Sequence, residues 1–231
     1  MKLSFVLPCY NEVKTIQRAI EEVRSLQVEK EIIIIDNCST DGTREILKSM
    51  ESGDLQIVYQ DKNYGFGRSI QVGSNLATGE FIYIQFADME YELPKYQAMV
   101  DRASNENLDA VFGSRLKARR RKESFYSIIK QKPAFLATFI TTFLINKWYG
   151  SNLTDIIGSK LYRTSSLKKV IPKTNGQGFD FELVSIMCKR NFRIKEVEVG
   201  YTPRENPDDK KIKPYHMINA LWAMLKVRFL S

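Results

Sequence analysis

The first half of the chain alternates between short apolar runs and longer segments in which apolar residues recur every three or four positions. Runs rich in β-branched residues predict strands, and the three-to-four-residue spacing predicts amphipathic helices. We expect strands at 3–7, 31–36, 55–59 and from residue 81, separated by helices at 12–26, 43–50 and 66–77. This alternation indicates right-handed crossovers, so we predict a doubly wound, mostly parallel α/β sheet with helices on both faces.

The second half continues with strands and helices at a less regular spacing. Further strands are predicted at 109–113 and 159–163, and further helices at 95–105 and 179–190. Residues 193–201 alternate between apolar and polar side chains, which is typical of a half-exposed strand and predicts an antiparallel edge. A C-terminal amphipathic helix is predicted at 215–230, and the chain, 1–231, is expected to form one domain.

The composition is that of an ordinary soluble globular protein, with 43% hydrophobic and 27% charged residues. A formal net charge of +8 indicates an anionic partner, which is a phosphate-bearing molecule, an acidic membrane surface or nucleic acid. The positive charge is dispersed, and aromatic residues do not alternate with basic ones on any segment. We therefore expect no nucleic-acid partner.

The cysteines and the N-terminus indicate a cytoplasmic protein. Cys9, Cys38 and Cys188 are an odd number without Cys-x-x-Cys spacing, which argues against both a disulfide framework and a zinc site. The first apolar stretch is too short for a signal-peptide core and leads directly into Pro8, so we interpret it as a strand and expect no export.

Residues 125–149 are apolar in the middle, with lysines along the segment and Trp148 and Tyr149 at its end. The largely apolar part, 133–145, is shorter than the roughly 20 residues that a membrane-spanning helix needs. Basic and aromatic flanks favour a helix at a membrane interface, because lysine stems and amphipathic rings sit at the level of the headgroups. A buried core helix is the alternative.

The segment from 81 to 94 begins as an apolar run and ends in Asp88, Glu90 and Glu92. In an open α/β sheet, ligands bind outside the carboxyl ends of the strands, where such acids can hold a metal or a polar substrate. We interpret Asp88 as functional. Glu92 is better explained as a cap of the following helix.

Several motifs occur in one order that resembles glycosyltransferase family 2, and most closely the dolichyl-phosphate or polyprenyl-phosphate sugar transferases. They lie at residues 8–12, 35–43, 63–67, 113–115, 154–163, 178–182 and 204–213, so the resemblance covers nearly the whole chain. It implies a GT-A fold, with 1–115 binding the nucleotide sugar and 116–231 the acceptor. Segments 125–149 and 215–230 would lie at the membrane surface.

The resemblance implies an inverting transfer of a sugar from a nucleotide diphosphate sugar to a lipid-linked acceptor, with polyprenyl phosphate the leading candidate. The alternatives are transfer to a sugar hydroxyl of a surface polysaccharide or lipopolysaccharide, and a non-catalytic nucleotide-sugar binder. The enzyme is expected in the cytoplasm, as a peripheral protein at the inner face of the membrane.

The same resemblance assigns candidate site residues. Positions that match donor- and phosphate-binding residues are Pro8, Tyr10, Glu12, Asp36, Asn63, Gly65, Asp88, Arg115, Arg204 and Lys211. Asp88 and Glu90 are expected to hold a divalent cation, Mg²⁺ or Mn²⁺. The family motif has an acid where this chain has Phe86, so we expect a weakly bound metal that relies on donor phosphates and water for its other ligands.

Asp155 matches the loop aspartate expected to activate the acceptor, with Asp180 or Glu182 as the alternative. The need for such a base depends on the acceptor. A phosphate is already ionised near neutral pH, whereas a sugar hydroxyl must lose a proton.

Overall fold

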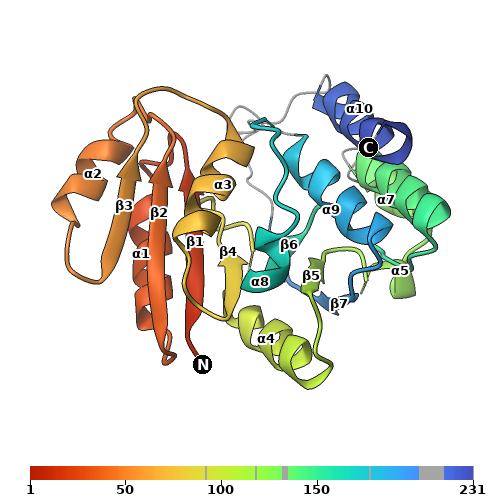
Figure 1. Cartoon of the computed structure of the whole chain (residues 1–231), viewed down its shortest axis with the longest axis horizontal. Coiled ribbons are helices and arrows are strands. Elements are labelled where there is room, and N and C mark those ends of the chain that lie inside the picture. Colours follow the sequence, from red (N-terminus) through yellow and green to blue (C-terminus); the bar gives the residue numbers. More distant parts are fainter. Residues whose placement is uncertain (92, 118, 132–134, 177, 203–215, 231) are drawn as a thin grey trace.

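The computed structural model describes residues 1–91, 93–117, 119–131, 135–176, 178–202 and 216–230. Its strands are β1 (Leu3–Cys9), β2 (Lys30–Asp36), β3 (Leu55–Tyr59), β4 (Phe81–Ile84), β5 (Ala110–Ser114), β6 (Ser159–Arg163) and β7 (Ile194–Glu198). Its helices are α1 (Ile16–Ser25), α2 (Thr43–Ser49), α3 (Phe66–Leu76), α4 (Tyr96–Asn105), α5 (Arg119–Lys122), α6 (Phe125–Gln131), α7 (Phe135–Tyr149), α8 (Thr164–Lys168), α9 (Phe179–Lys189) and α10 (His216–Phe229), with a 3₁₀ turn at Leu93–Lys95 (Figure 1).

The strands of the described chain form one seven-stranded sheet in the order β3-β2-β1-β4-β6-β5-β7. All neighbouring pairs are parallel except those that involve β6, which runs antiparallel to both β4 and β5. The mostly parallel sheet with an antiparallel part is therefore confirmed. The expected place of the antiparallel strand is wrong, because β7 lies at the edge but runs parallel to β5. The reversed strand lies inside the sheet.

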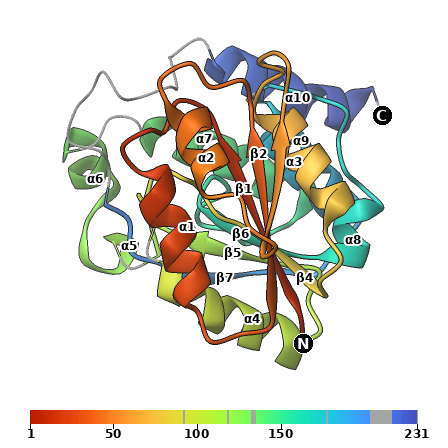
Figure 2. The same ribbon diagram turned by 90° about the vertical axis from the view of Figure 1, so that its left-hand side faces the viewer.

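Two apolar clusters, one on each face of the sheet, show why the second strand is so rich in isoleucine. Ile32 and Ile34 pack into the cluster with α1, α2 and α4, while Ile33 and Ile35 pack into the cluster with α3 and α9. A strand covered by helices on both faces has no solvated side, so each of its positions favours an apolar residue. Figure 2 shows α1 and α3 on opposite sides of the sheet, as the sequence pattern predicts.

The start of α3 lies against the loop that precedes α9. A Cβ atom added to Gly67 would lie 2.5 Å from the carbonyl oxygen of Thr174 and 2.6 Å from Cβ of Phe179. A side chain at position 67 would therefore push the two helices apart. The glycine thus brings the N-terminal ends of α3 and α9 together at the edge of the sheet where the candidate site lies.

The helix predicted at 12–26 begins only at Ile16. The backbone N–H groups of Thr15 and Ile16 both donate to the carbonyl oxygen of Glu12, so residues 12–15 form a turn. Asn11 has a φ of 54°, in the left-handed region, so it lies outside the right-handed helix. The four residues instead extend the loop after β1.

Candidate active site

Loops that follow β1, β2 and β3 are tied together by hydrogen bonds at the carboxyl edge of the sheet. The backbone N–H of Asn11 donates to Ser39 Oγ at 3.0 Å, and the N–H of Thr40 donates to Asn11 Oδ1 at 2.9 Å. Asn37 Nδ2 donates to Asn63 Oδ1 at 2.8 Å. The amides of Asn11 and Asn37 therefore connect the three loops, a role that the sequence did not predict.

Four of the expected donor-binding residues lie on these loops and Pro8 lies near the end of β1, which places all five at the same edge of the sheet. Pro8 and Glu12 are buried, Tyr10 is partly exposed, and Asn63 is exposed. Gly65 has a φ of 93°, a left-handed conformation that strongly favours glycine. The geometry thus groups these residues as the resemblance implies.

Asp36, at the end of β2, is fully buried and bonded within the protein. Arg44 Nε of α2 donates to Asp36 Oδ2 at 2.6 Å, and the N–H of Ser39 donates to Oδ1 at 3.1 Å. Arg44 also donates to the carbonyl oxygen of Gln60 at 2.6 Å. With both carboxylate oxygens bonded in this way, Asp36 is suited to ordering the loops after β2 and β3. It is less suited to the direct contact with base or ribose that the resemblance implies.

Asp88 and Glu90 form a tight turn just after β4, with both side chains partly exposed. The N–H of Glu90 donates to Asp88 Oδ1 at 3.1 Å, and Met89 between them has a φ of 60°. A left-handed non-glycine residue in a loop of this kind is uncommon and often marks a functional position. The two carboxylates offer the oxygen ligands that Mg²⁺ and Mn²⁺ prefer.

The described residues contain no group of three or more His, Cys, Asp or Glu side chains arranged to hold a metal. A cation bound at Asp88 and Glu90 would therefore take most of its ligands from substrate phosphates and water. Such coordination is common for Mg²⁺. The residues present fit a divalent cation that binds together with a nucleotide diphosphate.

Phe86, which stands where the family motif has an acid, is part of a line of aromatic rings. Its ring stacks on Phe66 with centroids 5.8 Å apart and an interplanar angle of 10°, and it lies 5.7 Å from the ring of Tyr91. Phe66 opens α3, so the stacked pair joins this helix to the loop after β4. The position that would otherwise supply a metal ligand instead presents a partly exposed apolar ring.

Tyr201, just beyond β7, is bound to the acidic turn. Its hydroxyl donates to the Glu90 carboxylate, the N–H of Thr202 donates to the Glu90 carbonyl oxygen at 2.9 Å, and Tyr201 pairs with Tyr91 in an antiparallel bridge. Burial, together with the nearby negative charge of Glu90, raises the pKa of Tyr201 to about 12. Tyr201 therefore stays protonated near neutral pH and fixes the position of Glu90.

Arg115, after β5, and Asp155, in the loop before β6, form a buried bidentate ion pair. Arg115 Nε lies 2.7 Å from Asp155 Oδ2, and Nη2 lies 3.0 Å from Oδ1. The guanidinium carbon lies 5.1 Å from the ring centroids of both Phe135 and Tyr201. The two side chains are 9% and 0% exposed. Arg115 is thus enclosed by protein groups, and the geometry favours a structural role over the expected contact with phosphate.

The ion pair also weakens the case for Asp155 as the base. Burial alone would raise the pKa of Asp155, but the attraction and hydrogen bonds of Arg115 outweigh it and lower the pKa below its ordinary value. A general base needs a pKa near the working pH and contact with the acceptor. A fully buried carboxylate with a lowered pKa meets neither condition, so Asp155 is better suited to ordering its loop.

Asp180 and Glu182 lie in the first turn of α9 but in different environments. Asp180 is partly exposed; burial raises its pKa, and the attraction of Lys160 opposes that rise. Glu182 is buried and accepts a hydrogen bond from the Thr174 hydroxyl. Of the three carboxylates expected to be catalytic, Asp180 is the one that is partly exposed.

The sequence model described as glycosyl transferase family 2 matches residues 4–171, which is most of the chain. The chain belongs to this family. Its mixed sheet with helices on both faces and a C-terminal helix confirms the GT-A architecture that the resemblance implies.

Curated relatives of the chain include sugar transferases of archaeal and bacterial origin. The chain is 24% identical over 230 residues to the low-salt glycan biosynthesis hexosyltransferase Agl6 of Haloferax volcanii, covering 94% of this chain and 54% of the relative. It is 26% identical over 236 residues to the undecaprenyl-phosphate 4-deoxy-4-formamido-L-arabinose transferase of Proteus mirabilis, covering 97% of this chain and 67% of the relative. The chain thus spans from about half to two thirds of the length of these relatives.

Among solved structures, glucosyl-3-phosphoglycerate synthase from Mycobacterium tuberculosis superposes with a TM-score of 0.70 and 17% identity. The match covers 99% of this chain and 78% of that protein, which was solved with Mn²⁺, uridine diphosphate and phosphoglyceric acid. At this identity the likeness shows the shared fold and no more.

Glu196 of β7 is a buried carboxylate that the sequence did not predict. It accepts hydrogen bonds from the N–H groups of Thr154 and Asp155, both at 2.8 Å, and from the Thr154 hydroxyl at 2.9 Å. Its burial shows that the edge strand holds the loop that carries Asp155.

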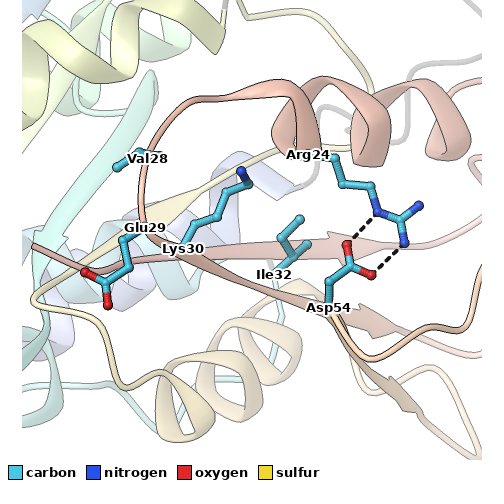
Figure 3. Close-up of a pocket in the computed structure, with 6 residues that line it drawn as sticks. All are labelled: Arg24, Val28, Glu29, Lys30, Ile32 and Asp54. Atoms are coloured by element: carbon cyan, nitrogen blue, oxygen red, sulfur yellow. Dashed lines mark hydrogen bonds and ion pairs between the residues drawn. The ribbon is translucent and has the colours of Figure 1, made fainter.

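A hollow of about 510 Å³ lies away from the carboxyl edge, near the start of β2. It is lined by Arg24, Val28, Glu29, Lys30, Ile32 and Asp54 (Figure 3). Arg24 pairs with Asp54 there at 2.7 and 2.9 Å. This hollow is not a candidate substrate site, because it lies at the amino end of the strands.

Of the other candidate residues, Glu92, Arg204 and Lys211 lie outside the described residues.

Proposed function

We propose that this chain transfers a sugar, with inversion, from a nucleotide diphosphate sugar to a polyprenyl phosphate at a membrane surface. The observation that carries the proposal is the pair of partly exposed carboxylates, Asp88 and Glu90, beside the joined loops at the carboxyl edge of the sheet. Family membership supports sugar transfer. The name of the Proteus mirabilis relative supports a polyprenyl-phosphate acceptor.

In this proposal Asp88 and Glu90 hold Mg²⁺ or Mn²⁺, which would neutralise the charge that develops on the leaving diphosphate. An acceptor phosphate oxygen attacks the anomeric carbon, the bond from that carbon to the donor diphosphate breaks, and the nucleoside diphosphate leaves. An ionised phosphate has no proton to lose. The enclosed state of Asp155 therefore favours a phosphate acceptor.

A sugar hydroxyl of a surface glycan is the second candidate acceptor. The observation that favours it is Asp180, which is partly exposed and has a raised pKa, as a general base requires. In that case the acceptor hydroxyl would give its proton to Asp180 as its oxygen attacks the same anomeric carbon.

A transfer assay tests the function. Purified protein is incubated with radiolabelled nucleotide sugars, Mg²⁺ or Mn²⁺, and vesicles that contain polyprenyl phosphate, and label is measured in the extracted lipid. We expect one nucleotide sugar to label the lipid, and vesicles without polyprenyl phosphate to remain unlabelled. Transfer to soluble glycans alone would support the second candidate. Nucleotide-sugar binding without any transfer would indicate a non-catalytic binder.

The proposed membrane contact rests on exposed apolar residues of α6, α7 and α10. Trp148 of α7 packs on Phe229 of α10 at 6.2 Å, and Figure 1 shows these two helices side by side. Exposed apolar residues on the three helices are Phe125, Tyr126, Leu136, Ile140, Phe143, Ile218, Trp222, Leu225 and Phe229, and exposed basic residues are Lys130, Lys147, Lys226 and Arg228. No helix within the described ranges is long and apolar enough to cross a bilayer.

This combination of apolar and basic side chains suits an acidic headgroup layer. We place the protein as a peripheral enzyme at the inner, cytoplasmic face of the membrane. Within the described residues the three cysteines, of which Cys9 and Cys188 are buried, form no disulfide, which is compatible with that reducing compartment.

Charged substitutions at the exposed apolar residues of α7 and α10 are expected to weaken vesicle binding. The double variant Phe143→Glu, Trp222→Glu should bind vesicles containing acidic lipid at least about tenfold less tightly, because it loses apolar contact and adds repulsion. Co-sedimentation measures binding, and circular dichroism checks the fold. Val13→Glu, at an exposed apolar position outside the three helices, is the control. Equal binding by all three proteins would contradict the proposed contact.

A further inference from the structure

Helix α7 has one exposed side and one side that packs on the candidate active site. Leu136, Ile140 and Phe143 are exposed, whereas Phe135 and Thr138 are buried. The spacing of 3.6 residues per turn places the two groups on opposite sides of the helix. The proposed contact with a membrane and the contact with the rest of the protein therefore share one rigid element.

Two hydrogen bonds join α7 to the loop before β6, which carries Asp155. Asn146 Nδ2 donates to the carbonyl oxygen of Leu153 at 2.8 Å, and the N–H of Leu153 donates to Asn146 Oδ1 at 3.0 Å. A shift of the helix would therefore also shift this loop.

Arg115 connects α7 with Tyr201, in addition to its ion pair with Asp155. Its Nη2 donates to Thr138 Oγ1 at 3.3 Å, and its guanidinium carbon lies 5.1 Å from the ring centroids of both Phe135 and Tyr201. These two rings lie 6.4 Å apart. Both belong to a small apolar cluster formed with α6, which is separate from the two clusters on the faces of the sheet. The position of α7 thus sets the surroundings of Tyr201.

Tyr201 reaches from this small cluster to the acidic turn. Its hydroxyl donates to the Glu90 carboxylate, and the N–H of Thr202 donates to the Glu90 carbonyl oxygen at 2.9 Å. Its ring lies 5.2 Å from the ring of Tyr91, with which it forms an antiparallel bridge. An unbroken series of contacts therefore leads from α7 through Arg115 and Tyr201 to Glu90.

Binding at the two ends of this series would order the same residues. A membrane that holds the exposed apolar residues of α6 and α7 restricts these helices, and a cation with a nucleotide diphosphate restricts the turn at Asp88 and Glu90. A ligand that orders a segment removes part of the entropy cost for a second ligand that needs the same segment ordered. Each partner should therefore tighten the binding of the other.

We propose that Tyr201 is a positioning residue that couples membrane contact at α7 to the binding of Mg²⁺ and nucleotide at Asp88 and Glu90. Contact with an acidic membrane would then raise the affinity for the donor, so that the enzyme binds its donor most tightly where a lipid acceptor is present. This inference rests on the proposed function, because it assumes both the membrane contact and a nucleotide diphosphate donor.

Reciprocal binding measurements test the coupling. The Kd values of UDP, GDP and dTDP with Mg²⁺ are measured by calorimetry, with and without vesicles that contain acidic lipid. We expect the nucleotide that binds to do so about fivefold more tightly with vesicles, and the vesicle Kd, measured by co-sedimentation, to fall by the same factor when that nucleotide is present. Hydrogen exchange of the Thr202 N–H, which is bonded to Glu90, should slow when vesicles alone are added.

Tyr201→Phe tests the route of the coupling. Phenylalanine keeps the ring beside Arg115 but removes the hydroxyl that bonds Glu90, so the factor should fall from about five to nearly one. Vesicle binding without nucleotide should change less than about twofold. Tyr59→Phe is the matched control, because the Tyr59 hydroxyl also donates to a glutamate, Glu51 at 2.8 Å, and lies outside the series of contacts. It should keep the wild-type factor.

Repulsion between acidic lipid and nucleotide acts on all three proteins alike, so the comparison among them cancels it. A wild type that binds nucleotide and vesicles independently would overturn the inference and leave the proposed function standing. The same holds if Tyr201→Phe keeps the wild-type factor, which is the result expected if Tyr201 only stabilises the fold. A wild type that binds no nucleotide, or no vesicles, would contradict the proposed function, and the inference would fail with it.

Discussion

Replacing Arg115 by alanine is expected to lower the free energy of unfolding by about 3–5 kcal/mol, the usual loss when one partner of a buried ion pair is removed. The substitution leaves Asp155 fully buried with its countercharge gone, and it removes the cation that lies between the rings of Phe135 and Tyr201. Urea denaturation, followed by circular dichroism and by tryptophan fluorescence, measures the difference.

Arg24 provides the control for this experiment. It makes a similar bidentate pair with Asp54, at 2.7 and 2.9 Å, but the two side chains are 31% and 51% exposed. Exposed pairs contribute about 0–1 kcal/mol, so Arg24→Ala should have a small effect. If Arg115→Ala costs no more than Arg24→Ala, the buried pair does not stabilise the fold as we infer.

The loss of unfolding free energy in Arg115→Ala should also depend on pH. Because the pKa of Asp155 is lower in the folded protein than its ordinary value of 3.8, the pair stabilises the fold above that value and loses this effect as the pH falls below it. The difference in unfolding free energy between the wild type and Arg115→Ala should therefore shrink in acid. A difference that grows below pH 3.8 would contradict the assignment.

The periodicity of the sequence was enough to predict the layers of the fold. Apolar positions on both sides of Ile32–Ile35 predicted a strand covered on two faces, and the structure divides those isoleucines between two apolar clusters. Strand direction was not predictable in the same way. Periodicity says which residues are buried but not which neighbour a strand pairs with, and β6 was therefore not recognised as the reversed strand.

The sequence predicted where the candidate residues lie in the fold, but not how several of them are bonded. Asp88 and Glu90 follow a buried strand, and the rule that ligands bind at the carboxyl ends of strands placed them correctly at that edge. Motif matching could not reveal that Asp155 and Arg115 are bound to each other, because they are 40 residues apart in the sequence. Glu196 and Lys160 were missed because each is a charged residue that becomes buried only through tertiary contacts.

Replacing Asp88 by asparagine is expected to lower the rate of metal-dependent sugar transfer by about 100- to 1,000-fold, the usual loss when a group that stabilises developing charge is removed. With Phe86 unable to ligate, Asp88 and Glu90 are the carboxylates of this turn, and Glu90 is also bonded to Tyr201. Asparagine keeps the Oδ1 atom that accepts the N–H of Glu90, so the turn itself should survive. Transfer rates are measured over a range of Mg²⁺ concentrations.

Two further variants test whether the loss of rate in Asp88→Asn comes from the metal. Glu90→Gln should lower the rate less than Asp88→Asn, because the Glu90 carboxylate also accepts a hydrogen bond from the Tyr201 hydroxyl. Phe86→Asp should lower the Mg²⁺ concentration needed for half-maximal donor binding about tenfold, since it adds a carboxylate beside Asp88. An Asp88→Asn enzyme that keeps its Mg²⁺-dependent rate would place the metal elsewhere. An unchanged Mg²⁺ requirement in Phe86→Asp would show that an acid at position 86 adds no metal ligand. The role of Phe86 would then lie in its contacts with the neighbouring aromatic rings.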